Sequence, residues 1–134
     1  MWPEASISHT SSEIASVGWL MFSTCVRMTI EWSVPLGQTR PITMALHSLA
    51  AEVRTSRGNI GCSVATDIGN RGTVRYTEEW LTEEDLRHHV RSDTFAQLVT
   101  LMEDATHPPR IEFTLVHETR GLDYVEEVRA STLP

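Results

Sequence analysis

Residues 60–80 read IGCSVATDIGNRGTVRYTEEW, and this stretch decides the fold. Its first part alternates between apolar and polar residues, as in a strand with one buried face. Three side chains share that face: Cys62, Val64 and Ile68. Residues 69–72 are typical of a hairpin turn, because Gly and Asn accept positive φ. A second alternating strand is predicted at 73–80, and one of its faces carries Val74, Tyr76 and Trp80.

A strand and a helix are predicted before this hairpin. Residues 28–34 alternate, which favours a half-buried strand. Residues 38–56 carry apolar side chains at steps of four, three and four, the spacing of an amphipathic helix. Thr39 or Arg40 should cap this helix, and the glycine of Arg57-Gly58-Asn59 should end it.

A helical region and a last strand follow the hairpin. Thr82, with acidic residues directly after it, predicts a helix start, and Ser92 predicts a second one. Pro108-Pro109 should end the second helix, and residues 110–117 alternate as a strand. The tail from Gly121 could form a short helix.

The predicted order is strand, helix, strand, strand, helix, strand. This is the ferredoxin-like α+β arrangement, a four-stranded antiparallel sheet with its helices on one face. We expect the domain to span residues 27–118, after a flexible extension at 1–26 and before a tail at 119–134. Met28 is an alternative natural start.

The alternation also predicts a second, polar face of the sheet. It mixes acids and arginines, among them Glu31, Arg75, Glu79 and Glu112. Such a face suits either solvent or a partner sheet joined through ion pairs.

The composition excludes several classes of protein. The net charge is -7, and the 11 basic residues are all Arg, so neither non-specific nucleic-acid binding nor a Lys Schiff base is expected. Two cysteines cannot build a multi-cysteine metal cluster. The apolar run 17–26 is too short to cross a bilayer and has no basic residue before it, so we expect no membrane association and a cytoplasmic protein.

His89 is the main candidate for chemistry. Its spacing from Leu86 places it on the inward side of its helix, whereas its neighbour His88 points away. An inward His can move a proton, although a core His bonded to a backbone carbonyl is the alternative. The pairs Glu84–His88 and Asp85–His89 have ligand spacing, but such pairs are common by chance and we expect no metal site.

Large rings on the helix-facing side are candidates for a pocket. Trp80, Tyr76 and Trp32 could line a site for a flat aromatic ligand, with Trp32 expected opposite Trp80. Ordinary core packing is the alternative. The pocket and the ordinary core differ in whether a second polar group lies beside His89. The candidates for this group are Ser63, His47 and Asn59.

The segment Tyr76-Thr77-Glu78-Glu79-Trp80, followed by His89, Ser92 and Phe95, resembles the antibiotic biosynthesis monooxygenase domain family. The stretch 57–62 is similar to the segment that leads into the family's second strand, although Arg57 replaces the usual Pro. The likeness covers about residues 28–117.

The resemblance implies a homodimer, an α+β barrel whose two sheets pack face to face. It also implies oxygenation of an electron-rich quinol or anthrone by molecular oxygen, with no metal or other cofactor. His89 would accept the proton, and Trp80 with Tyr76 would line the pocket. Haem-degrading members use an Asn in the first strand, which this chain lacks. The alternative is a non-catalytic barrel that binds a small hydrophobic ligand.

Overall fold

A computed structural model of the chain describes residues 25–103, 105 and 107–131. The extension and the apolar run predicted at the amino terminus therefore lie outside the described residues, apart from Cys25 and Val26. The elements are β1 (Cys25–Ser33), η1 (Leu36–Gln38), α2 (Thr39–Val53), β2 (Asn59–Thr66), β3 (Thr73–Trp80), α3 (Glu83–Val90), α4 (Asp93–Met102), β4 (Arg110–Val116) and α5 (Leu122–Ala130).

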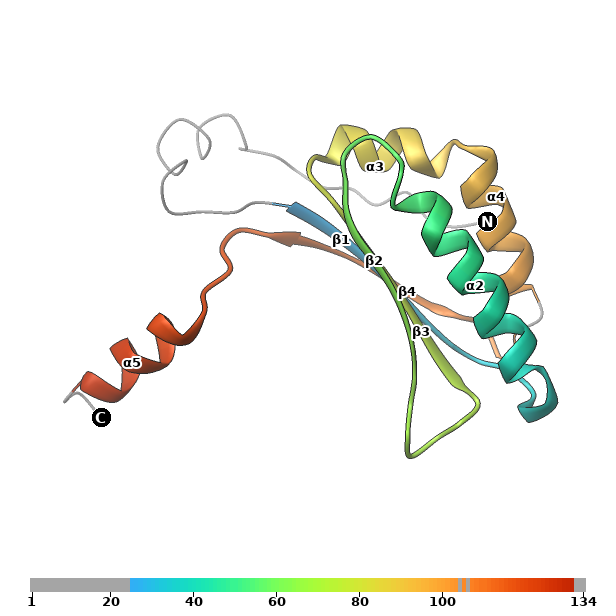
Figure 1. Cartoon of the computed structure of the whole chain (residues 1–134), viewed down its shortest axis with the longest axis horizontal. Helices are drawn as coiled ribbons and strands as arrows, with labels where there is room; N and C mark the ends of the chain where they lie inside the picture. Colours follow the sequence, from blue (N-terminus) through green and yellow to red (C-terminus); the bar gives the residue numbers. More distant parts are fainter. Residues whose placement is uncertain (1–24, 104, 106, 132–134) are drawn as a thin grey trace.

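The four strands form one antiparallel sheet in the order β2-β3-β1-β4. Helices α2, α3 and α4 cover one face, and none of the helices in the described residues lies on the other face (Figure 1). The predicted ferredoxin-like α+β fold is therefore confirmed. Its local boundaries also agree closely, since β3 occupies 73–80 as predicted and β1 begins slightly earlier, at Cys25.

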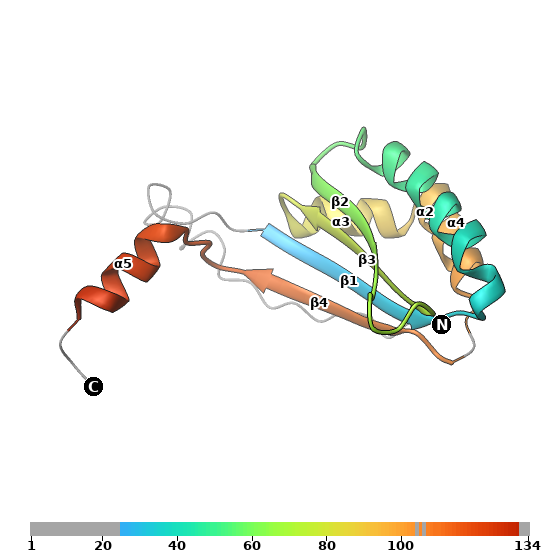
Figure 2. The same ribbon diagram turned by 60° about the horizontal axis from the view of Figure 1, so that its bottom comes forward.

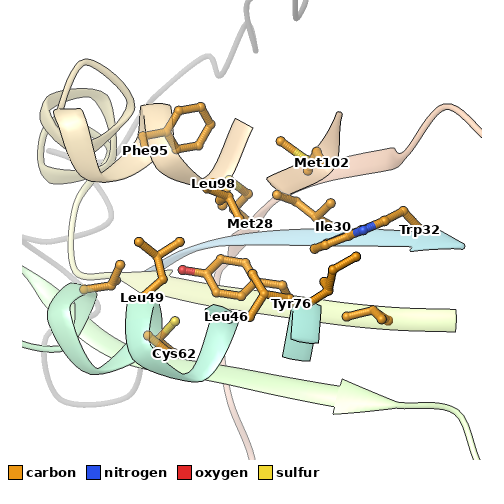
Figure 3. Packing of buried hydrophobic residues seen from close by; sticks show 14 of the residues in the cluster. Met28, Ile30, Trp32, Leu46, Leu49, Cys62, Tyr76, Phe95, Leu98 and Met102 are labelled. Carbon is orange, nitrogen blue, oxygen red and sulfur yellow. The ribbon is translucent and has the colours of Figure 1, made fainter. Parts of the chain in front are cut away.

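The core lies between the sheet and the helices. Figure 3 shows side chains of β1 and β3 packed against Leu46 and Leu49 of α2 and against Leu98 of α4. These residues are apolar at period two in the strands and at helical spacing in the helices, so each element buries one side. Burial of this continuous apolar layer is the main stabilising term of the fold.

Two helix starts were predicted correctly and one was not. The Thr82 hydroxyl accepts a hydrogen bond from the Asp85 backbone N–H, and Ser92 accepts one from Phe95. The cap predicted at Thr39 or Arg40 is wrong, because both residues lie inside α2. The turn η1 leads directly into this helix, so the cap position falls at Gln38, whose side chain makes no capping bond.

The β2–β3 turn uses side chains in place of positive φ. Asp67 accepts from the Gly69 N–H, and Asn70 accepts from the Gly72 N–H. The predicted hairpin turn between these strands is confirmed. Its expected positive φ is wrong, because among the residues that the structure places positive φ occurs only at Gly58, before β2. Ile68, predicted to face inward, lies in this turn and is 98% exposed.

The tail forms the helix α5, which extends away from the rest of the molecule in both views (Figures 1 and 2). All its residues are exposed, including Leu122, Tyr124, Val125 and Val128. Over the described ranges, no helix has the length and apolarity needed to span a bilayer.

Candidate active site

One buried polar cluster lies beneath the helices, built by β3 and α3. Alternation along β3 turns Tyr76, Glu78 and Trp80 toward the helices, since every second side chain of a strand shares a face. The helix α3 follows at once and brings His89 onto the same spot, three residues after the buried Leu86. The exposed fractions are 0% for Tyr76 and Glu78, 1% for Trp80 and 4% for His89.

Glu78 is the centre of this cluster. The Tyr76 hydroxyl donates to Oε2 of Glu78 at 2.6 Å, and the Trp80 indole Nε1 donates to Oε1 at 3.0 Å. Nε2 of His89 lies 3.0 Å from Oε2. A buried carboxylate is strongly unfavourable unless hydrogen bonds replace its hydration, and these contacts supply that replacement.

Aromatic rings hold His89 in place. The Trp80 ring stacks on the imidazole, with centroids 4.6 Å apart and planes at 29°. Phe95 of α4 meets the imidazole edge-on at 5.6 Å. Ser92 donates to the backbone carbonyl of His89 while it caps α4, so it couples the end of α3 to the start of α4. The imidazole therefore has a defined orientation.

Burial also changes the acidity of the neighbouring side chains. Desolvation raises the pKa of the Tyr76 hydroxyl far above its usual range, and the nearby Glu78 carboxylate raises it further. Desolvation raises the pKa of the Cys62 thiol to about 11, against the lowering effect of a hydrogen bond with Tyr76. Both groups therefore stay protonated at neutral pH.

The cluster has the parts needed to move a proton. An imidazole that contacts a carboxylate through one nitrogen has a second nitrogen with which it can accept or deliver a proton. The carboxylate can then stabilise the imidazolium that forms. The aromatic rings beside His89 could contact a flat apolar molecule.

The structure brings together three of the four predicted site residues. His89, Trp80 and Tyr76 meet in the cluster, and Trp32 does not. The expectation that Trp32 lies opposite Trp80 is wrong, because Trp32 pairs with Val74 and Trp80 pairs with Val26. Six residues of strand separate these positions, about 20 Å. Figure 3 shows Trp32 next to Ile30, at the end of the core away from Phe95.

The second polar group beside His89 is Glu78, which the sequence reasoning missed. Of the candidates considered, Ser63 and His47 are exposed, and the Asn59 side chain donates to the carbonyls of Gly61 and Glu79. The signal was present in the sequence, because alternation that points Tyr76 and Trp80 inward must also point Glu78 inward.

The open face of the sheet carries ion pairs. Arg27 contacts Glu79 at 2.9 Å, Arg75 contacts Glu31 at 2.6 Å and Arg110 contacts Glu112 at 3.0 Å. An open depression on this face is lined by Thr29, Glu31, Arg75, Arg110 and Glu112. In the part of the chain that the structure describes, no group of three or more His, Cys, Asp or Glu is arranged to hold a metal ion.

Comparison with known proteins places the chain in a family. The sequence profile of the antibiotic biosynthesis monooxygenase family matches residues 25–101, more than half of the chain, and this range includes the whole cluster. The chain belongs to this family. No curated protein matches the sequence significantly.

Solved structures share the fold of this antibiotic biosynthesis monooxygenase family member. A conserved protein from Methanosarcina mazei Go1 is 24% identical with a TM-score of 0.64, and the match covers 69% of this chain and 92% of that one. A candidate antibiotic biosynthesis monooxygenase from Deinococcus radiodurans is 17% identical with a TM-score of 0.66, covering 72% and 96%. One from Caulobacter crescentus CB15 is 20% identical with a TM-score of 0.61, covering 71% and 92%.

Proposed function

We propose that the protein is a monooxygenase that oxidises a small, electron-rich aromatic molecule of the quinol or anthrone type with molecular oxygen. The observation that carries this proposal is the buried contact between His89 and Glu78, stacked against Trp80. Family membership supports the reaction class, and the cluster supplies a place for its proton transfer. Cytoplasmic location stays a prediction.

The proposed reaction balances with oxygen as the oxidant. The substrate gains one oxygen atom and loses two hydrogen atoms, and the second atom of O₂ leaves as water. The substrate supplies all the electrons, and no metal or other cofactor takes part in the proposed step. Removal of a proton from the substrate is the step that protein groups can assist, because the resulting anion gives electrons to oxygen more readily.

Each residue of the cluster has a proposed role in that step. His89 accepts the proton from the substrate, and Trp80 with Tyr76 borders the ring of the substrate. Trp80 and Phe95 cover His89 from two directions, so the substrate must displace one of these rings to reach it. Phe95 is the better candidate for movement, because its side chain makes no hydrogen bond, whereas Trp80 is 1% exposed and donates to Glu78.

The proposal includes a homodimer formed through the open faces of two sheets. The ion pairs on that face involve side chains that are partly exposed in the single chain, so they can re-pair across an interface. Such pairs favour the correct docking geometry more than they increase affinity.

Burial of the cluster favours a second candidate function. Tyr76, Glu78, Trp80 and His89 are at most 4% exposed, and each makes at least one hydrogen-bond contact within the cluster. A barrel that binds a small hydrophobic ligand without turning it over fits a core whose polar side chains are already hydrogen-bonded within the protein. Turnover distinguishes the two candidates.

Oxygen consumption tests the proposed function. We expect the purified protein to consume oxygen above the autoxidation rate with at least one compound in a panel of hydroquinones, naphthoquinols and anthrones. Replacement His89→Ala should lower that rate by about 10²–10⁴-fold, the usual contribution of a general base. The matched control is His88→Ala, since His88 is the exposed neighbour on the same helix.

Folding of both variants is checked by circular dichroism and by their sedimentation. Equal loss of activity in the two variants would argue against a role for the buried imidazole. A folded wild-type protein that binds members of the panel without oxygen consumption would favour the binding module.

A further inference from the structure

The hydrogen atoms in the contacts of Glu78 can be assigned, because two of its three partners, Trp80 and Tyr76, act only as donors to it. The indole nitrogen of Trp80 carries a hydrogen at all relevant pH values and can only donate. The Tyr76 hydroxyl stays protonated in its buried position and donates its hydrogen to Oε2. Both oxygens of Glu78 therefore already accept a hydrogen bond.

Because both of its oxygens accept from donors with fixed roles, Glu78 acts as the acceptor in this cluster. The third contact, from Nε2 of His89, reaches Oε2 at 3.0 Å. A bare lone pair on Nε2 would face the lone pairs of a carboxylate oxygen, which is repulsive at that distance. The contact is attractive only if Nε2 carries a hydrogen, as in the Nε2–H tautomer or the imidazolium.

The shape of the imidazole keeps its other nitrogen from taking the place of Nε2 beside Glu78. Trp80 lies against one face of the imidazole, and Phe95 meets it edge-on. Rotation of the imidazole by half a turn about Cβ–Cγ would place the carbon Cε1, and not Nδ1, where Nε2 meets Glu78, and the contact would be lost. The structure therefore determines which nitrogen meets the carboxylate, as well as the distance between them.

We propose that Glu78 is a positioning residue that holds the hydrogen of neutral His89 on Nε2 and so leaves Nδ1 as the atom that accepts the proton from the substrate. The assignment of Nδ1 as the reacting atom rests on the proposed function, whereas the assignment of the tautomer rests on the hydrogen bonds around Glu78. In the step itself, an O–H or C–H bond of the substrate breaks and an N–H bond forms at Nδ1. The electron pair stays on the substrate, and the imidazolium faces the Glu78 carboxylate.

The tautomer can be measured directly in the wild-type protein. Nitrogen-15 NMR of protein labelled at histidine distinguishes a protonated ring nitrogen from a bare one by chemical shift and by coupling to the ring hydrogens. The signals of His89 are those that disappear in His89→Ala. We expect the Nε2–H tautomer at neutral pH. Either the Nδ1–H tautomer or an imidazolium, which has no nitrogen free to accept a proton, would overturn the proposal without the need for any variant at Glu78.

A matched pair of substitutions on β3 tests the role of the carboxylate. Glu78→Gln keeps the shape of the side chain, but its amide can donate a hydrogen to Nε2, so we expect a shift of His89 toward the Nδ1–H tautomer. Glu79→Gln changes the neighbouring residue on the opposite face and should leave the tautomer unchanged. An unchanged tautomer in Glu78→Gln would overturn the proposal.

Kinetics separates positioning from packing. With a substrate that supports oxygen consumption, Glu78→Gln should lower kcat by about tenfold or more and leave KM nearly unchanged, because the interaction acts on the proton transfer. A change in KM alone would overturn the role in that transfer. If the wild-type protein consumes no oxygen, the proposed function fails, and the NMR result still decides the tautomer.

Discussion

Glu78 and Glu79 are consecutive residues of β3 with the same side chain and opposite surroundings. Glu78 points toward the helices, is fully buried and contacts Tyr76, Trp80 and His89. Glu79 points to the open face, is about one-third exposed and pairs with Arg27. The difference arises only from the pleat of the strand, which sends successive side chains to opposite faces.

The comparison shows that the face of the sheet determines what a carboxylate can contribute. On the open face, water screens the ion pair, and such pairs are worth about 0–1 kcal/mol. In the buried cluster, removal of one partner leaves donors without acceptors, and each of these costs about 1–3 kcal/mol. The same substitution at the two positions should therefore have very different consequences.

The largest expected effect is on folding. We expect Glu78→Ala to lower the free energy of unfolding by about 3–5 kcal/mol, the range for breaking a buried polar pair. Glu79→Ala should lower it by less than about 1 kcal/mol. Urea unfolding followed by tryptophan fluorescence measures both. Equal losses would mean that Glu78 is hydrated and that the buried cluster does not form in solution.

An intermediate effect is expected for the pH dependence of stability. Because the pKa of Cys62 is raised from 9.0 to about 11, the folded state keeps its proton where the unfolded state loses it. Its contribution to stability is therefore complete below pH 9 and is lost as the pH rises to about 11. Urea unfolding at several pH values should show this loss, and it should be smaller in Cys62→Ala.

Thiol labelling gives an independent check on the same side chain. Folded protein should react with a thiol reagent at pH 8 far more slowly than urea-unfolded protein, because the thiolate is the reacting species. Rapid labelling of Cys62 in the folded state would show that the inner face is open to solvent beside Tyr76.

The smallest effect on folding is expected on the open face. Arg75→Glu places an acid beside Glu31, yet it should change the free energy of unfolding of the single chain by less than about 1 kcal/mol. Its effect should be seen in assembly, as an increase of about tenfold or more in the dissociation constant of the proposed dimer. Analytical ultracentrifugation measures this constant. An unchanged value would place the interface elsewhere.

Much of this fold could be predicted from the sequence because local rules agree with one another. Alternation identified β3 to the residue, and Thr82 and Ser92 identified two helix starts, because each signal acts within a few residues. The cap of α2 could not be predicted, since η1 continues directly into that helix. The turn before β3 was placed correctly, but its backbone conformation was not, because Asp67 and Asn70 stabilise it through their side chains.

The site was predicted less completely because it depends on register. Inward positions for His89, Trp80 and Tyr76 follow from periodicity within single elements. The separation of Trp32 from Trp80 depends on how β1 aligns with β3, which no local pattern reports. Glu78 was overlooked because acids are rarely buried without a partner, and its partners come from two different elements.

The arrangement of the cluster on a single strand restricts how the protein can change over evolutionary time. Tyr76, Glu78 and Trp80 can each be replaced separately, and the other two keep their places. A single-residue insertion early in β3 would instead move all three to the opposite face at once and bring their neighbours inward, Glu79 among them. Relatives that keep this chemistry should therefore vary β3 by substitution, and differences in length should collect in the β2–β3 turn.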